Sequence, residues 1–145
     1  MSIYPTKIVL AVDGSDQSKL AARHAIELAD RTGSELHVIH VGLLSPWAHP
    51  DTLSPQQYQR LKDEAQKRFD AEVLEIEQMG GKITQPYLRM GRVDSEVIKL
   101  SEELDAGLIV IGNRGMGSLA RILLGNDAES IVRHAPCPVM VVRKD

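Results

Sequence analysis

Short apolar runs rich in β-branched residues alternate along this chain with longer stretches of helical periodicity. Residues 7–13 read KIVLAVD, residues 15–32 show a helical pattern, and residues 35–41 form a second short run, ELHVIHV. A nearly continuous apolar run is typical of a strand that is buried on both faces. Two such strands joined by a helix run parallel, so the beginning of the chain predicts a β-α-β unit.

The alternation continues to the end of the sequence. Residues 43–55 carry three prolines and no periodicity, which predicts a loop. Ser54 and Pro55 then stand in the order that is favoured at a helix start, and Gly80 and Gly81 end that helix. Further strands are expected at residues 82–90, 108–112 and 139–143, and further helices at residues 93–104 and 128–134.

This order of elements predicts an α/β fold with one domain over residues 1–145. We expect a Rossmann-like, doubly wound, five-stranded parallel sheet with helices on both faces. Pro86 removes a ladder donor from the third strand, so that strand should lie at a sheet edge. Ligands of such sheets bind at the carboxyl ends of central strands, and here AVDGS (residues 11–15) and VIGNRG (residues 110–115) should meet at one crevice.

Composition and charge exclude several classes of function. The formal charge is -3 and no basic stripe is present, so a nucleic-acid partner is not expected. No apolar run is long enough to span a bilayer, no secretory leader is evident, and membrane insertion is therefore not expected. Cys137 is the only cysteine, which fits a reducing compartment, and we expect it to be a small buried hydrophobe in a cytoplasmic protein.

The densest cluster of glycines surrounds the fourth strand and the last helix. Gly112, Gly115 and Gly125 are spaced G-x2-G-x9-G, and Asn126 follows directly. Backbone N–H groups at a strand end and at a helix start both suit a phosphate, and Arg114 could add a cation. Turns and a helix start without any ligand explain the same spacing, so the glycines alone leave both interpretations open.

Other candidate residues point less directly to chemistry. Asp13 follows the first strand and precedes Gly14, so it could orient a ribose hydroxyl or Mg²⁺, or simply end the strand. His37 and His40 are three residues apart and should lie on opposite faces of a strand, and the dispersed histidines predict no metal site of their own. No P-loop or nucleophile–base arrangement is evident, so efficient catalysis is not expected.

Three segments together resemble the universal stress protein family over essentially the whole chain. They are KIVLAVDGS (residues 7–15), the glycine pattern from Gly112 to Gly125, and HAPCPVMVVR (residues 134–143). The resemblance implies the five-stranded parallel fold, with strand order 3-2-1-4-5, and ATP binding. It places Asp13 near the ribose and the metal, and the backbone of Val41 near the adenine. The full set of cofactor-binding candidates is Ala11, Val12, Asp13, Val41, Ile111, Gly112, Asn113, Arg114, Gly115, Gly125, Asn126 and Asp127.

The chain departs from the family pattern after the last glycine. Asn126 stands where nucleotide-binding members usually carry Ser or Thr, and it can still cap a helix and donate a hydrogen bond. Asp127 stands where they usually carry a small apolar residue. At an effective dielectric of about 20, unit charges ~5 Å apart repel by roughly 3 kcal/mol, about a hundredfold in affinity. Alternatively, Asp127 points outward, or caps the helix itself and takes the place of a phosphate.

Two hypotheses follow, from different classes. The first is a small cytoplasmic stress-response protein that binds ATP with Mg²⁺ and acts as a regulatory module. The second is a dimeric interaction protein of the same fold that no longer binds ATP and acts through protein partners. Slow ATP hydrolysis ranks below both. For either hypothesis we expect a homodimer through the apolar last strand, in which Val139, Met140, Val141 and Val142 pair with their own copies.

Overall fold

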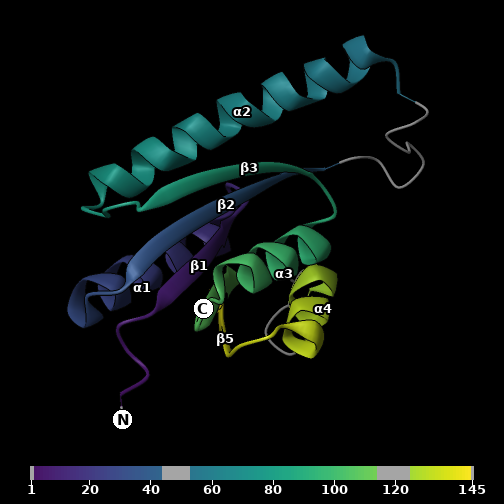
Figure 1. Ribbon diagram of the computed structural model, residues 1–145. Coiled ribbons are helices and arrows are strands. Elements are labelled where there is room, and N and C mark those ends of the chain that lie inside the picture. Colours follow the sequence, from purple (N-terminus) through teal and green to yellow (C-terminus); the bar gives the residue numbers. More distant parts are fainter. Residues whose placement is uncertain (1, 44–52, 114–124, 145) are drawn as a thin grey trace.

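The computed structural model describes residues 2–43, 53–113 and 125–144. Strands and helices alternate strictly along these residues (Figure 1). The elements are β1 (Lys7–Val12), α1 (Asp16–Thr32), β2 (Glu35–Leu43), α2 (Pro55–Gln78), β3 (Gln85–Gly91), α3 (Val93–Leu104), β4 (Leu108–Gly112), α4 (Asn126–His134) and β5 (Val139–Val142).

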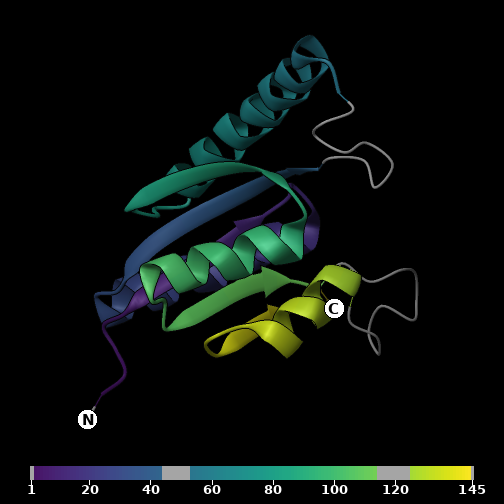
Figure 2. The same cartoon turned by 45° about the vertical axis from the view of Figure 1, so that its right-hand side comes forward.

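The strands form one parallel sheet in the order β3-β2-β1-β4-β5. The predicted fold class and strand order are therefore confirmed, and β3 lies at an edge as its proline requires. Helices α1 and α2 cover one face, while α3 and α4 lie side by side on the other (Figures 1 and 2).

Both faces of the central strands are buried, which explains their continuous apolar sequences. Ile8 and Leu10 of β1 pack with Ala21 and Ala25 of α1, whereas Val9 packs in the cluster under α3 and α4. Alternate residues of one strand thus serve two separate cores. The core contains few aromatic residues. The side chains that α1 buries are small, so this helix can lie close to the sheet.

Helix starts follow local chemistry that can be read from the sequence. Ser15 caps α1 by accepting a hydrogen bond from the Ser18 N–H, and Gly33 ends the helix in the left-handed conformation with φ 69°. Ser54 forms a capping box with Gln57 before Pro55, the first residue of α2. The predicted start of α2 at Ser54 and Pro55 is confirmed.

The ends of several strands and helices differ from the sequence prediction. In two cases a side chain takes the place of a backbone hydrogen-bond partner. β1 ends one residue early because the Asp13 carboxylate accepts from the Ser15 N–H at 2.9 Å and turns the chain. β3 begins at Gln85 rather than at residue 82, since the Leu36 N–H donates to the Thr84 hydroxyl at 3.0 Å. Two elements are longer than expected: β2 runs on to Leu43, and α4 begins at Asn126.

Among the helices of the described chain, none combines the length and the hydropathy that crossing a bilayer would need. The most tightly buried large side chains, including Ile39, Leu100 and Ile131, lie on strands or on the inner faces of α3 and α4.

Candidate functional site

The carboxyl ends of β1 and β4 lie level at the centre of the sheet. Ile8 is in register with Leu108 and Leu10 with Val110, so β1 and β4 advance together. β2 continues past them, because Val12 is in register with His40 and three more β2 residues follow, paired with β3. The sheet therefore has a step at its carboxyl end, with the β2 backbone from Val41 onward standing beyond β1.

Gly112, the last residue of β4, is required by the packing of α1. A β-carbon at this position would lie 2.6 Å from the carbonyl carbon of Gln17 and 2.8 Å from the backbone nitrogen of Ser18. Main-chain atoms in the first turn of a helix cannot move aside cheaply. This glycine thus brings the start of α1 onto the end of β4, and helix packing accounts for it without a ligand.

Asn113 fastens the start of α4 to the same strand end. Its backbone N–H donates to the Val142 carbonyl at 2.8 Å, and its buried side-chain oxygen accepts from the Gly125 N–H at 2.8 Å. Gly125 is the N-cap of α4, with φ -63°, and it provides no side-chain oxygen to the first turn. A helix start of this kind presents N–H groups and a partial positive charge at its end.

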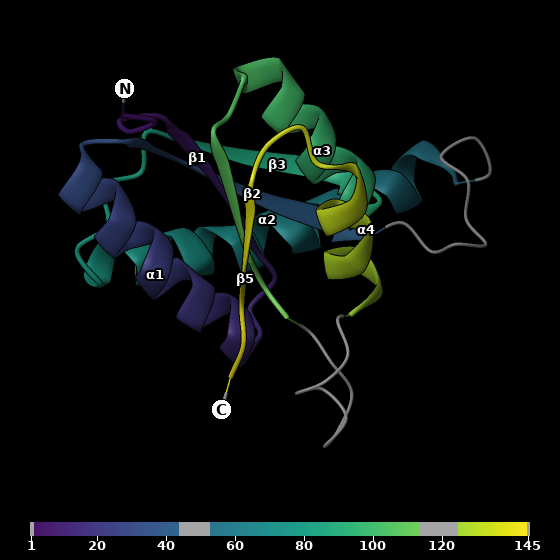
Figure 3. The ribbon, with the colours of Figure 1, turned by 90° about the horizontal axis from the view of Figure 1, so that it is seen from below.

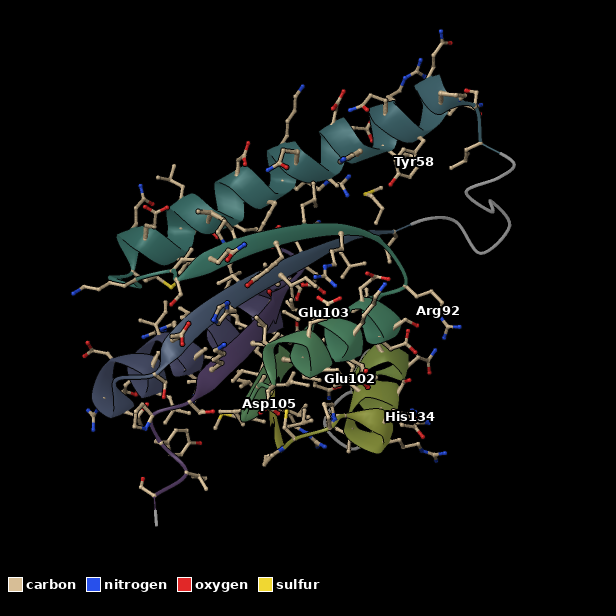
Figure 4. The ribbon with its side chains drawn as sticks, in the orientation of Figure 1. Tyr58, Arg92, Glu102, Glu103, Asp105 and His134 are labelled. Carbon is tan, nitrogen blue, oxygen red and sulfur yellow. The ribbon has the colours of Figure 1, made fainter. Side chains whose placement is uncertain are left out.

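A buried carboxylate fixes α4 against α3 on the same face. Asp94, in the first turn of α3, accepts from the Ser130 hydroxyl at 2.7 Å, from the Ser95 N–H at 2.8 Å and from Arg92 at 3.1 Å. Arg92 is labelled at the start of α3 in Figure 4. Burial alone would raise the pKa of Asp94, but the two serine hydrogen bonds and the Arg92 charge outweigh it and lower the pKa below its usual value.

Acidic side chains are conspicuous around the strand ends. Asp13 is exposed directly after β1, and its backbone N–H donates to the Ser18 hydroxyl at 3.0 Å. Asp16, in the first turn of α1, is paired with Lys144 beyond β5 at 3.0 Å. The hydrogen bond from Lys144 and its charge hold the pKa of Asp16 below its usual value. Asp127 is exposed in the first turn of α4.

A surface hollow lies between α1 and α2. It touches the end of β1 at Val12 and Gly14, but its walls are mostly Ser18 and Lys19 of α1 and side chains of α2. Neither the carboxyl end of β4 nor the start of α4 lines this hollow. The strand-end arrangement, with its converging backbone and charge, is therefore the stronger candidate for a ligand site.

Comparison with known proteins identifies the family. Residues 5–143 match the model of the universal stress protein family. A universal stress protein of Methanocaldococcus jannaschii is 37% identical over 140 residues, which make up 95% of this chain and 82% of that protein. This chain belongs to the universal stress protein family.

Solved structures of the family share the fold. Universal stress protein UspA from Lactobacillus plantarum superposes with a TM-score of 0.79 at 27% identity, covering 95% of this chain and 97% of that one. The universal stress protein from Archaeoglobus fulgidus in complex with dAMP gives a TM-score of 0.61 at 23% identity, covering 97% of this chain and 99% of that one. The resemblance of the sequence to the universal stress protein family is thus confirmed.

The described part of this universal stress protein brings most of the predicted site residues to the carboxyl edge. Asp13 directly follows β1, Gly112 ends the adjacent strand β4, and Val41 lies buried on the β2 extension. Arg114 and Gly115 lie outside the described residues. The other predicted positions are placed at the ends of β1 and β4 or at the start of α4: Ala11, Val12, Ile111, Asn113, Gly125, Asn126 and Asp127.

One detail of the sequence interpretation is wrong and two are incomplete. Asn126 is the first residue of α4 and not its cap, because Gly125 takes the cap position; Asp127 likewise is not the cap. No local sequence pattern indicates the hydrogen bond between Asn113 and Gly125, since the two residues are separated by a long segment. Sequence reasoning also missed the pairing of Asp16 with Lys144, because in the sequence both look like ordinary charged surface residues. Within the described residues, no three histidine, cysteine or acidic side chains gather as a metal site.

Proposed function

We propose that this universal stress protein binds an adenine nucleotide, ATP with Mg²⁺, at the carboxyl ends of β1 and β4 and acts as a cytoplasmic regulatory module. The observation that best supports this proposal is that the end of β4, the start of α1 and the start of α4 meet at one point. Gly112 lets the start of α1 touch the end of β4, and Asn113 ties the start of α4 to the same place. Two helix starts beside one strand end make an electropositive backbone setting for phosphates.

The residues at this edge fit the parts of the nucleotide. The exposed Asp13 carboxylate offers the oxygen ligands that Mg²⁺ prefers and reaches the ribose side of the site. The Val41 backbone, beyond the end of β1, would face the adenine. The remaining proposed contacts, to ribose and phosphates, are Ala11, Val12, Ile111, Gly112, Asn113, Arg114, Gly115, Gly125, Asn126 and Asp127.

A bound nucleotide in a protein of the same fold supports this proposal. The Archaeoglobus fulgidus protein was solved in complex with dAMP, so an adenine nucleotide is compatible with the architecture. The sequence carries no P-loop motif, which favours a binding role over a catalytic one.

The alternative is a dimeric interaction protein without nucleotide. β5 is a sheet edge with Met140 36% exposed and with Val139 and Val141 half-buried. Such an edge can pair with its own copy across a two-fold axis. Val141→Lys should convert a dimer to monomers in sedimentation experiments, and an unchanged dimer would place the interface elsewhere. An unidentified protein partner would then carry the regulatory signal.

Asp127 provides the test that separates these two functions. If its carboxylate faces the phosphates, Asp127→Val should tighten ATP binding at least about tenfold, because roughly 3 kcal/mol of repulsion acts at ~5 Å. Adenosine binding should change little, and added salt should narrow the difference between the proteins. Asp70→Val, on the exposed face of α2, is the matched control. Absence of ATP binding by the wild-type protein at millimolar nucleotide, measured by calorimetry, would refute the proposal and favour the alternative.

A further inference from the structure

An ion pair joins the C-terminal end of the chain to the start of α1 at the carboxyl edge of the sheet. The Lys144 ammonium lies 3.0 Å from a carboxylate oxygen of Asp16. Lys144 follows β5, and Asp16 is the first residue of α1. Seen from below the sheet, the C-terminal end of the chain comes to rest beside the start of α1 (Figure 3).

Both partners of this pair flank the end of β4. Val142, two residues before Lys144, is in register with Gly112. Gln17, next to Asp16, has its backbone against the same glycine. The Lys144 ammonium is therefore held close to the strand end around which the phosphates of a nucleotide are proposed to lie.

A phosphate group can compete with Asp16 for Lys144, because both side chains of this ion pair are exposed. The Lys144 side chain is 56% exposed and that of Asp16 is 69% exposed. Ion pairs with this degree of exposure contribute little net stability, because water and salt screen them. A lysine has a flexible stem and three donors, and a phosphate group offers more negative charge and more acceptor oxygens than one carboxylate.

We propose that Lys144 is a phosphate-binding residue, which Asp16 holds when no nucleotide is present and which transfers to the phosphates of a bound nucleoside triphosphate. This inference rests on the proposed nucleotide binding and adds the residue that distinguishes nucleotides by their number of phosphates. Asp16 acts as the competitor: it keeps Lys144 at the site and lowers the affinity for the triphosphate until the phosphates displace it.

Binding of ATP, AMP and adenosine to four proteins tests the transfer. The proteins are the wild type, Lys144→Met, Asp16→Asn and the double variant, compared by calorimetry at two salt concentrations. Lys144→Met should weaken ATP binding about three- to fivefold, weaken AMP binding less, and leave adenosine unchanged. Asp16→Asn should tighten ATP binding, and this gain should shrink in the Lys144→Met background because no lysine is left to release.

Lys19, the lysine of α1, supplies the matched control. Lys19 also forms an ion pair, at 3.6 Å with Glu75 of α2, and it faces the other helix instead of the strand end. Lys19→Met removes the same charge from the same region and should leave ATP affinity nearly unchanged. Equal effects of Lys19→Met and Lys144→Met, or an equal gain from Asp16→Asn in both backgrounds, would overturn the inference while leaving nucleotide binding intact. Failure of the wild-type protein to bind ATP would overturn both.

Discussion

A buried histidine–glutamate pair between β2 and α2 offers the sharpest test of how this fold is held together. His40 Nδ1 lies 2.6 Å from a Glu72 carboxylate oxygen, and the two side chains are only 8% and 10% exposed. The atoms are close but poorly aligned, since neither His40 Nδ1 nor either Glu72 oxygen has a well-directed hydrogen bond within the described residues. The contact between these two side chains is therefore the main polar contact of each group.

Replacement of His40 by leucine should be strongly destabilising. Leucine preserves most of the ring's volume against Phe69, whose ring centroid lies 5.7 Å from that of His40. It leaves the Glu72 carboxyl group buried without its partner, and removal of one member of a buried pair costs about 3–5 kcal/mol. For a chain of 145 residues, that is roughly 10–15 °C in the melting temperature.

A second substitution should recover most of the loss. In the double variant His40→Leu, Glu72→Leu, apolar side chains replace both partners, and such exchanges are often neutral or stabilising. Urea unfolding followed by circular dichroism gives the free energy of unfolding for each protein. The reasoning is refuted if His40→Leu is as stable as the wild type, or if the double variant is no more stable than His40→Leu.

The other histidine of β2 is the internal control. His37 is buried on the opposite face, as its sequence spacing predicts, and it contacts the Tyr87 hydroxyl at 2.9 Å and Glu35 at 3.1 Å. The Glu35 side chain is 49% exposed, so water can solvate it when the imidazole is removed. We expect His37→Leu to cost about 1–2 kcal/mol, well below the cost of His40→Leu.

Three further predictions concern the strand ends and α4. Gly112→Ala should cost about 2–3 kcal/mol in urea unfolding, because the added methyl group meets the backbone of the first turn of α1; wild-type stability would show that α1 can move away freely. Asn113→Ala should cost about 1–3 kcal/mol by leaving the Gly125 N–H without its buried acceptor, and unchanged hydrogen exchange of that amide would contradict it. The lowered pKa of Asp94 stabilises the fold above the unfolded value of about 3.9, and this stabilisation is lost as the pH falls through the folded value. Ser130→Ala should therefore cost about 1–2 kcal/mol at pH 7 and progressively less below pH ~4, whereas a difference independent of pH would exclude Asp94 as the cause.

The sequence alone was sufficient to predict which strands and helices form, because their formation depends mainly on contacts within a few residues. The β-branched runs of β1 and β4 are local patterns, and so is the cap at Ser54, which bonds an N–H only three residues away. Pro86 even identified a sheet edge, since a missing donor excludes a central position. The order of these elements then left few topologies open, because parallel crossovers have one favoured hand.

Only the tertiary structure decided what the edge residues contact. An apolar pattern says which face of an element is buried, but it does not say which side chain lies opposite, since many partners satisfy the same pattern. The glycine of β4 could thus be read in sequence as a phosphate loop or a turn, and the fold shows that Gly112 makes room for α1. The pairing of His40 with Glu72, and of Asp16 with Lys144, likewise joins residues that are far apart in the chain. Their meeting depends on how β2 lies under α2 and on where β5 ends beside α1, which sequence periodicity does not encode.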